Sequence, residues 1–214
     1  MEVKYFVYNY TNGDELILVK ARNLKEGIWK FKLYGKLVVN GQYYAWLPQR
    51  ALLEENTKFL NPSQFTTLTI PSTAKDVISV AYYNQNNDTV VSTSGRGYTL
   101  DNRVKPDIAA GGVNAMVIGK DGKIESASGS SVATAIVTGI VSLILEWSIV
   151  LGNEKDISMS NLISYIIRGA KKRPGDNYPN KQWGYGMVNM EGIFDAIRGE
   201  YRIGNLFIRY APKK

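Results

Sequence analysis

Residues 126–134 read SASGSSVAT, and this stretch of small side chains leads directly into a long apolar run. Such a pattern predicts a tight turn followed by a helix that other elements bury. We expect the helix to span about residues 131–151, because apolar side chains recur there at helical spacing, at Val132, Ile136, Ile140, Leu143, Ile144 and Trp147. The junction between turn and helix is the starting point for the rest of the interpretation.

The serine at this junction, Ser131, has two features that covalent catalysis can use. The first turn of a helix leaves backbone N–H groups unpaired and carries partial positive charge, so an oxyanion that forms beside Ser131 would be stabilised by its own N–H. Gly129, two residues earlier, allows a substrate backbone to come close. Taken alone, however, the stretch is more typical of serines that only cap a helix.

Four segments in a fixed order change that interpretation. They are IPSTAKDVISVA at residues 70–81, SGRG with KPDIAAGGV within 94–113, GSSVATAIVTG at 129–139, and WGYGMVNM at 183–190. In this order they resemble four motifs of the subtilisin-like serine peptidases, the third being the nucleophile motif Gly-Thr-Ser-Met-Ala. The resemblance covers residues 68–198 and aligns the nucleophile with Ser131.

The resemblance implies an α/β fold, the C-terminal portion of a subtilisin-like parallel sheet. It implies a serine endopeptidase that cleaves a protein substrate through an acyl-enzyme on Ser131, without a cofactor or a metal ion. The chain departs from the motifs at Ser130, Ala135, Ile136 and Gly111, where the family has Thr, Pro, His and Pro. None of these changes removes a catalytic atom.

The groups that would activate the serine are missing. The chain contains no histidine, and the family's Asp-x-Gly, His-Gly-Thr and oxyanion-asparagine motifs have no counterpart in its 214 residues. A serine hydroxyl without a base is a poor nucleophile near neutral pH. We therefore expect the isolated chain to be inactive, and its partner to be the missing N-terminal half of the catalytic domain. Lys120, Lys123 and Glu125 lie near Ser131 in sequence, and a serine–lysine dyad is an alternative source of the base. Solvated loop charges are the default interpretation of these residues.

The first fifty residues have the pattern of antiparallel β-structure. Alternating runs with Asn-Gly turns lie at residues 3–8, 15–19, 27–35 and 36–47, and predict part of a sandwich. Segments such as AWLP at 45–48 resemble the clostridial germination proteases, in which a jelly-roll domain is inserted into the subtilase fold. This narrower resemblance implies a spore cortex-lytic pro-enzyme as substrate and a spore-associated location.

A domain boundary is expected where this pattern breaks, between Ala51 and Thr67. The β-sandwich or jelly-roll remnant would cover residues 1–52, and the subtilisin-like portion residues 53–214. In the second part, apolar strands at 77–81 and 107–110 predict a parallel sheet that is covered on both faces.

Two further helices are expected in the second part. One spans about residues 158–168, with Ser158 or Ser160 as its cap and Gly169 as its stop. The other spans about residues 190–198 and is ended by Gly199.

Composition limits the partners and the chemistry. The net charge is +7, but the 26 basic residues are scattered, which argues against nucleic acid as a partner. Without cysteine there is no disulfide or thiolate chemistry, and without histidine the usual proton shuttle is absent. The apolar run at residues 135–152 approaches membrane-spanning length but contains Glu146, so a buried helix in a soluble protein is expected and no membrane contact. No signal peptide is apparent at residues 1–5.

Three functions remain open from the sequence. The chain is part of an active endopeptidase, or it belongs to a pseudoprotease that serves as a regulatory binding scaffold, or its tyrosine-rich front strands form a module that binds carbohydrate or protein. Unpaired sheet edges would also allow a homo-oligomer.

Overall fold

A computed structural model describes residues 1–6, 14–38, 41–48 and 50–209 of the chain. The chain divides into two compact units, Met1–Thr57 and Lys58–Lys214. The sequence predicted a domain boundary between residues 52 and 53. Whether the two parts are separate domains stays a prediction.

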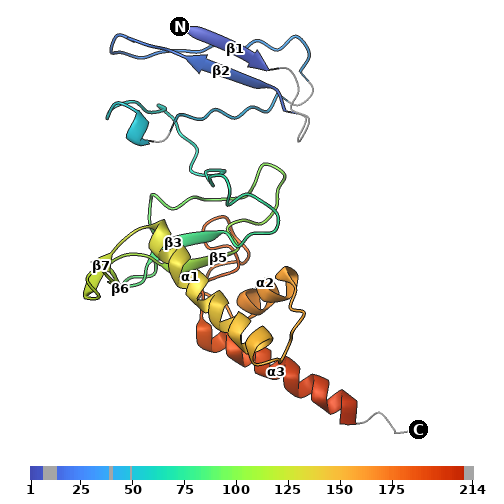
Figure 1. The fold of residues 1–214 in the computed structure, drawn as a ribbon. Coiled ribbons are helices and arrows are strands. Elements are labelled where there is room, and N and C mark those ends of the chain that lie inside the picture. Colours follow the sequence, from blue (N-terminus) through green and yellow to red (C-terminus); the bar gives the residue numbers. More distant parts are fainter. Residues whose placement is uncertain (7–13, 39–40, 49, 210–214) are drawn as a thin grey trace. The chain divides into compact units, whose positions relative to one another are not determined.

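Among the described residues of the first unit, one pair of strands is antiparallel (Figure 1). Strand β1 (Glu2–Phe6) pairs with β2 (Leu16–Lys20), with Phe6 opposite Leu16. A short 3-10 turn, η1, follows at Arg50–Leu52. Residues 11–13 of the predicted first reversal and Asn40 of the second lie outside the described residues.

The other strands predicted for this unit are wrong where the structure describes them. Residues 27–35, 36–38 and 41–47 form no strand, and large side chains such as Trp29 and Tyr34 are exposed. A strand needs a neighbour for its backbone N–H and C=O groups, and even a single pair of strands is marginal in water. An alternating sequence gives a strand one apolar face, but it does not supply a second strand to pair with its backbone. The expected jelly-roll remnant is therefore not confirmed.

The second unit is built around a three-stranded sheet in the order β4-β3-β5. Strand β3 (Val80–Asn84) runs parallel to β5 (Ile108–Gly111), with Val80 opposite Ile108, and antiparallel to the short β4 (Thr89–Val90). The parallel pair confirms the expected α/β fold, although β3 begins three residues later than predicted. Strands β6 (Ala115–Ile118) and β7 (Ile124–Ala127) form a separate hairpin.

Three helices follow the strands. Helix α1 (Ser130–Leu145) continues as a π-helical turn, η2 (Glu146–Val150), in agreement with the predicted helix at 131–151. Helix α2 (Met159–Arg168) is capped by Ser158, whose Oγ accepts a 3.1 Å hydrogen bond from the Asn161 N–H. Helix α3 (Met190–Arg209) passes through Gly199, so the predicted end there is wrong. A single interior glycine costs a helix only about 1 kcal/mol and does not stop it.

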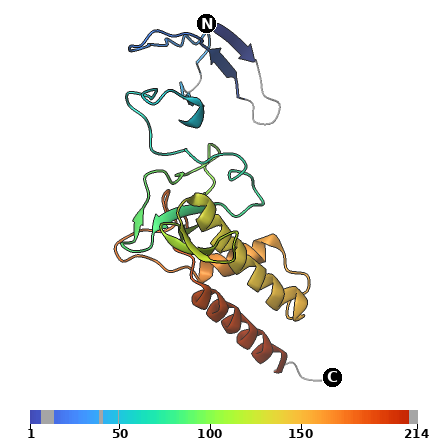
Figure 2. The ribbon, with the colours of Figure 1, turned by 60° about the vertical axis from the view of Figure 1, so that its left-hand side comes forward.

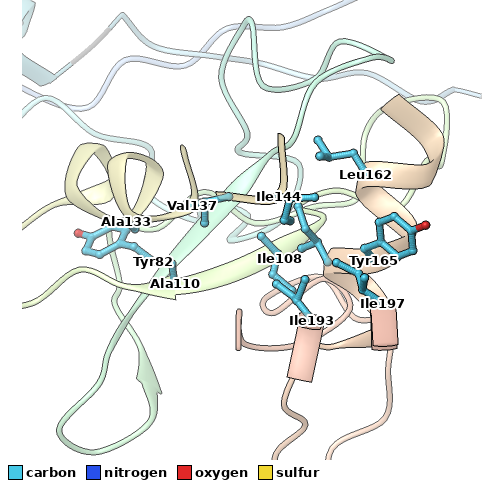
Figure 3. Packing of buried hydrophobic residues seen from close by; sticks show 11 residues of the cluster. Tyr82, Ile108, Ala110, Ala133, Val137, Ile144, Leu162, Tyr165, Ile193 and Ile197 are labelled. Carbon is cyan, nitrogen blue, oxygen red and sulfur yellow. The ribbon is translucent and has the colours of Figure 1, made fainter. Parts of the chain in front are cut away.

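The helices cover one face of the sheet, and Figure 3 shows this core from close by. Its buried side chains come from the sheet and all three helices: Tyr82, Ile108, Ala110, Ala133, Val137, Ile144, Leu162, Tyr165, Ile166, Ile193 and Ile197. The period of α1 brings Ala133, Val137 and Ile144 onto this side.

The opposite face of the sheet is covered by irregular chain. Ala81 and Ala109 alternate onto that face and pack against the buried side chains of Trp183 and Met187. The Ala109 N–H donates to Gly186 O, and the Val188 N–H to Ala109 O, at 2.8 Å each, which attaches this segment to β5. Both faces are covered as expected, but helices cover only one of them.

Helix α1 and its π-helical turn follow one another without a break in the chain (Figure 2), and their buried residues are Ala133, Val137, Ile144 and Ser148. By length and composition, Ser130–Val150 is the one helix among the described residues that could cross a membrane, with a mean hydropathy of 1.9. Only 22% of that window is buried, so the helix is less buried than the sequence led us to expect. That the helix packs within a soluble protein stays a prediction.

Candidate active site

The turn before α1 depends on Gly129. This residue precedes the first residue of the helix and has φ 143° and ψ 166°, a conformation that is almost restricted to glycine. No side chain caps the helix, in contrast to Ser158 at α2. The alternative in which these serines serve only as caps is therefore not supported by the geometry.

Ser131 is the second residue of α1 and is exposed to solvent. The N–H groups of Val132 and Ala133 both donate to Gly129 O, at 3.1 and 3.3 Å. Within the described residues, no hydrogen bond uses the N–H of Ser131 or its hydroxyl. An exposed serine beside an unpaired amide at a helix N-terminus can supply the nucleophile and one oxyanion donor for acyl transfer, although not the base.

The turn is attached to the carboxyl end of β5. The Gly129 N–H donates a 2.7 Å hydrogen bond to Gly112 O, immediately after the strand. A Cβ at residue 112 would lie 2.8 Å from Gly129 O and 3.1 Å from the Tyr82 ring, so only glycine permits this close approach. Ligand sites of open α/β sheets lie at such carboxyl ends, which fits the position of Ser131.

A second contact joins the same two loops. The Asn114 N–H donates to Ser128 Oγ at 2.8 Å, and the Ser128 hydroxyl donates to Asn114 Oδ1 at 3.2 Å. The contact between Asn114 and Ser128 cannot be recognised from the sequence, because only the fold brings these two positions together.

The charged residues near Ser131 in sequence do not meet it in space. Lys120, Lys123 and Glu125 are exposed on the β6–β7 hairpin, and in the described structure no hydrogen bond or ion pair joins any of them to Ser131. The Glu125 carboxylate instead lies against Gly119. The described residues therefore form no serine–lysine dyad at Ser131.

The buried charges lie at the other end of β5. Lys105 Nζ is 2.6 Å from Asp107 Oδ2 and donates to Val77 O at 2.6 Å, and the same carboxylate oxygen accepts the Ser79 N–H at 2.7 Å. These bonds satisfy the buried ion pair, as burial of charge demands. They anchor the beginning of the strand whose other end carries the nucleophile turn. Among the described residues, no group of three or more acidic side chains could hold a metal ion.

Comparison with protein families gives one match. The model described as the subtilase family matches residues 55–186. This range contains β3, β5, the turn at Gly129 and the whole of α1.

Curated relatives and solved structures agree with that match. Serine protease AprX of Bacillus subtilis (strain 168) is 32% identical over 145 residues, which are 58% of this chain and 31% of that protein. Subtilisin-like protease SBT6.1 of Arabidopsis thaliana is 29% identical over 67% of this chain and 14% of its own length. The structure of the Clostridium perfringens CspB protease superimposes with a TM-score of 0.64 at 36% identity, over 67% of this chain and 32% of that one. The chain thus spans less than a third of each relative, and the predicted resemblance is confirmed.

Proposed function

Since this chain belongs to the subtilase family, we propose that it is the nucleophile-bearing part of a serine endopeptidase, with Ser131 as the residue that forms the acyl-enzyme. The observation that carries this proposal is the exposed hydroxyl of Ser131 in the first turn of α1, held by a glycine turn against the carboxyl end of β5. Its homologues are subtilase-like serine proteases, which supports the same reaction class.

The proposed reaction follows from the local geometry. The Ser131 hydroxyl attacks the carbonyl carbon of the scissile bond, and the negative charge that develops on the carbonyl oxygen accepts the Ser131 N–H and interacts favourably with the helix N-terminus. The hydroxyl proton passes to a base and then to the leaving amine, after which water hydrolyses the acyl-enzyme. The 214 residues contain no histidine, so the imidazole base must come from polypeptide outside them.

The isolated chain is accordingly proposed to be inactive. Removing a member of the catalytic triad leaves only a residual rate enhancement on the order of a thousandfold over water, from binding and the oxyanion site. The partner is proposed to be a subtilase segment with the Asp-x-Gly and His-Gly-Thr motifs. The exposed apolar side chains of α1 and its π-helical turn support this proposal, because a further segment of a subtilase could cover them.

The substrate is proposed to be a spore cortex-lytic pro-enzyme that is activated by limited cleavage. The support is the similarity to a clostridial CspB protease at 36% identity, together with the resemblance of residues 45–48 to the germination proteases.

A fluorophosphonate probe tests the nucleophile, because it reacts only with activated serines. We expect no labelling of the chain alone, and labelling once a subtilase segment carrying the Asp and His motifs is added. Ser131→Ala should abolish the labelling, whereas Ser130→Ala, one residue away and equally exposed, should retain it. Labelling of the lone chain, or labelling that survives Ser131→Ala, would contradict the proposal.

A regulatory scaffold is the second candidate, and the absence of histidine favours it. In that case the chain binds its partner and the pro-enzyme without cleavage. The same experiment separates the two: a stable complex, measured by size-exclusion chromatography, with no labelling of Ser131 would support the scaffold.

A further inference from the structure

The side chain of Gln85 contacts the loop that holds the nucleophile turn. Gln85 follows the last residue of β3, and its carboxamide spans the backbone of Val113. Its Oε1 accepts the Val113 N–H at 3.2 Å, and its Nε2 donates to Val113 O. Both polar groups of the amide are therefore used by one residue of the β5–β6 connection.

The first of these bonds acts on the peptide group that holds Gly129. The Val113 N–H and the Gly112 C=O belong to the same peptide unit, and in a trans peptide they point in opposite directions. Gln85 Oε1 is bound on one side of this planar unit, and the Gly129 N–H is bound at 2.7 Å on the other. The Gln85 side chain is thus connected to Gly129, two positions before Ser131, through this one peptide group.

The second bond acts on the next peptide group in the same way. Val113 C=O accepts from Gln85 Nε2, and the Asn114 N–H of that unit donates to Ser128 Oγ at 2.8 Å. Two adjacent peptide planes therefore run between one carboxamide and two successive residues of the nucleophile turn, Ser128 and Gly129. Hydrogen bonds in such chains polarise and strengthen one another.

Gly111 gives independent support for this arrangement. A Cβ at residue 111 would lie 3.1 Å from both Cβ and Oε1 of Gln85, and no other neighbour is as near. Residue 111 is also where the chain departs from the proline of the resembled motif. The small residue there leaves the space that the Gln85 side chain occupies.

We infer that Gln85 is a positioning residue for the nucleophile turn, which orients the peptide planes on either side of Val113 so that they hold Ser128 and Gly129 in place. The inference rests on the proposed function in that Ser131 is the residue being positioned. Among the described residues, the hydrogen bonds of the Gln85 side chain go to the Val113 backbone and not to Ser131, so its effect on Ser131 passes through the backbone.

Substitutions at Gln85 separate the two links. Gln85→Met has a similar shape and removes both hydrogen bonds. Gln85→Glu keeps an acceptor for the Val113 N–H but replaces the donor to Val113 O, so it breaks only the link to Ser128. Asn86→Ala is the matched control, because Asn86 is exposed and next to Gln85 in the chain. The backbone N–H of Asn86 donates to Asn84 Oδ1, and this bond does not depend on the Asn86 side chain.

Amide NMR of the full chain reads these links without requiring activity. In Gln85→Met we expect hydrogen exchange at Gly129 and Asn114 to accelerate about tenfold, since each link is a hydrogen bond of ordinary strength. In Gln85→Glu only Asn114 should change, and in Asn86→Ala neither should. A uniform acceleration across α1 and the sheet, or unchanged exchange at both amides in Gln85→Met, would overturn the inference.

Labelling by a fluorophosphonate, with the Asp- and His-bearing subtilase segment present, tests the consequence for Ser131. Gln85→Met should lower the maximal labelling rate about tenfold and leave the probe concentration for half-maximal rate within twofold. An unchanged labelling rate would overturn the positioning role. If the wild-type chain is not labelled under any condition, the proposed function fails, and the amide pattern still decides whether Gln85 holds the turn.

Discussion

Replacing Gly129 by alanine should destabilise the second unit by about 2 kcal/mol. The backbone of this residue, at φ 143° and ψ 166°, lies in a region that is essentially accessible only to glycine, and a side chain held there costs about 1–3 kcal/mol. Steric collision adds nothing, because the nearest heavy atom to an added Cβ is Ser131 N at 4.0 Å. The whole cost is therefore conformational.

Relaxation of the turn does not remove this cost. If residue 129 moves to an allowed conformation, its N–H leaves Gly112 O, and a hydrogen bond of about 1 kcal/mol is lost. The expected range is thus about 1–3 kcal/mol. With a urea m-value of about 2 kcal/mol/M, the midpoint of unfolding falls by about 1 M.

Urea unfolding followed by circular dichroism at 222 nm measures this shift. The matched control is Gly139→Ala, which lies within α1 with open space around its Cβ. There alanine should raise stability by up to about 1 kcal/mol, because it is the better helix former. A Gly129→Ala midpoint within error of the wild type, or a loss of similar size at Gly139, would refute the reasoning.

Three further outcomes can be measured. Gly169→Ala should destabilise the unit by about 3 kcal/mol or more in the same urea assay, since an added Cβ would come within 2.3 Å of the α3 backbone; an unchanged midpoint would show that α2 and α3 are not packed this closely. Ile144→Ala should cost about 2–5 kcal/mol because this side chain is fully buried, whereas the partly exposed Ile136→Ala should cost clearly less; equal losses would contradict the assigned core face of α1. Burial, with the hydrogen bond to Glu154, raises the pKa of Tyr165 to about 12, so the contribution of this residue to stability is complete below about pH 10 and is lost as the pH rises toward 12. Absorbance at 295 nm should show a late-titrating tyrosine that Tyr165→Phe removes, and a titration of all tyrosines that is complete near pH 10 would contradict the raised pKa.

The helices show which predictions from sequence succeed. The apolar period in residues 131–151 predicted α1 and its π-helical turn, and Ser158 predicted the start of α2. These signals are local, because a helix satisfies its hydrogen bonds within a few residues. The predicted end at Gly199 failed, since one glycine weighs little against the rest of a long helix.

The strands show the opposite case. The alternation at residues 27–35 predicted a strand, and the described structure has none there. Strands require partners that lie elsewhere in the chain, so a pattern within one segment cannot guarantee them. For β3 and β5 the partners are available, and the parallel pair formed as expected.

The candidate site divides in the same way. The turn at Gly129 and the helix start at Ser131 were recognised from nine consecutive residues, because they are properties of neighbouring positions. The role of Ser131 as nucleophile came from four motifs in a fixed order along the chain. Gln85 was not recognised, since 28 residues separate it from the Val113 that it binds. No periodicity connects such positions.

The sequence by itself thus assigned the family and the nucleophile candidate, from four short motifs in a fixed order, and the helix that carries the nucleophile, from the apolar period of contiguous residues. Folding alone determined which loop holds the glycine turn, that Lys120, Lys123 and Glu125 stay away from Ser131, and that one face of α1 is left exposed. The physical reason is that hydrogen bonds and packing act across a few ångströms of space, whatever the separation along the chain.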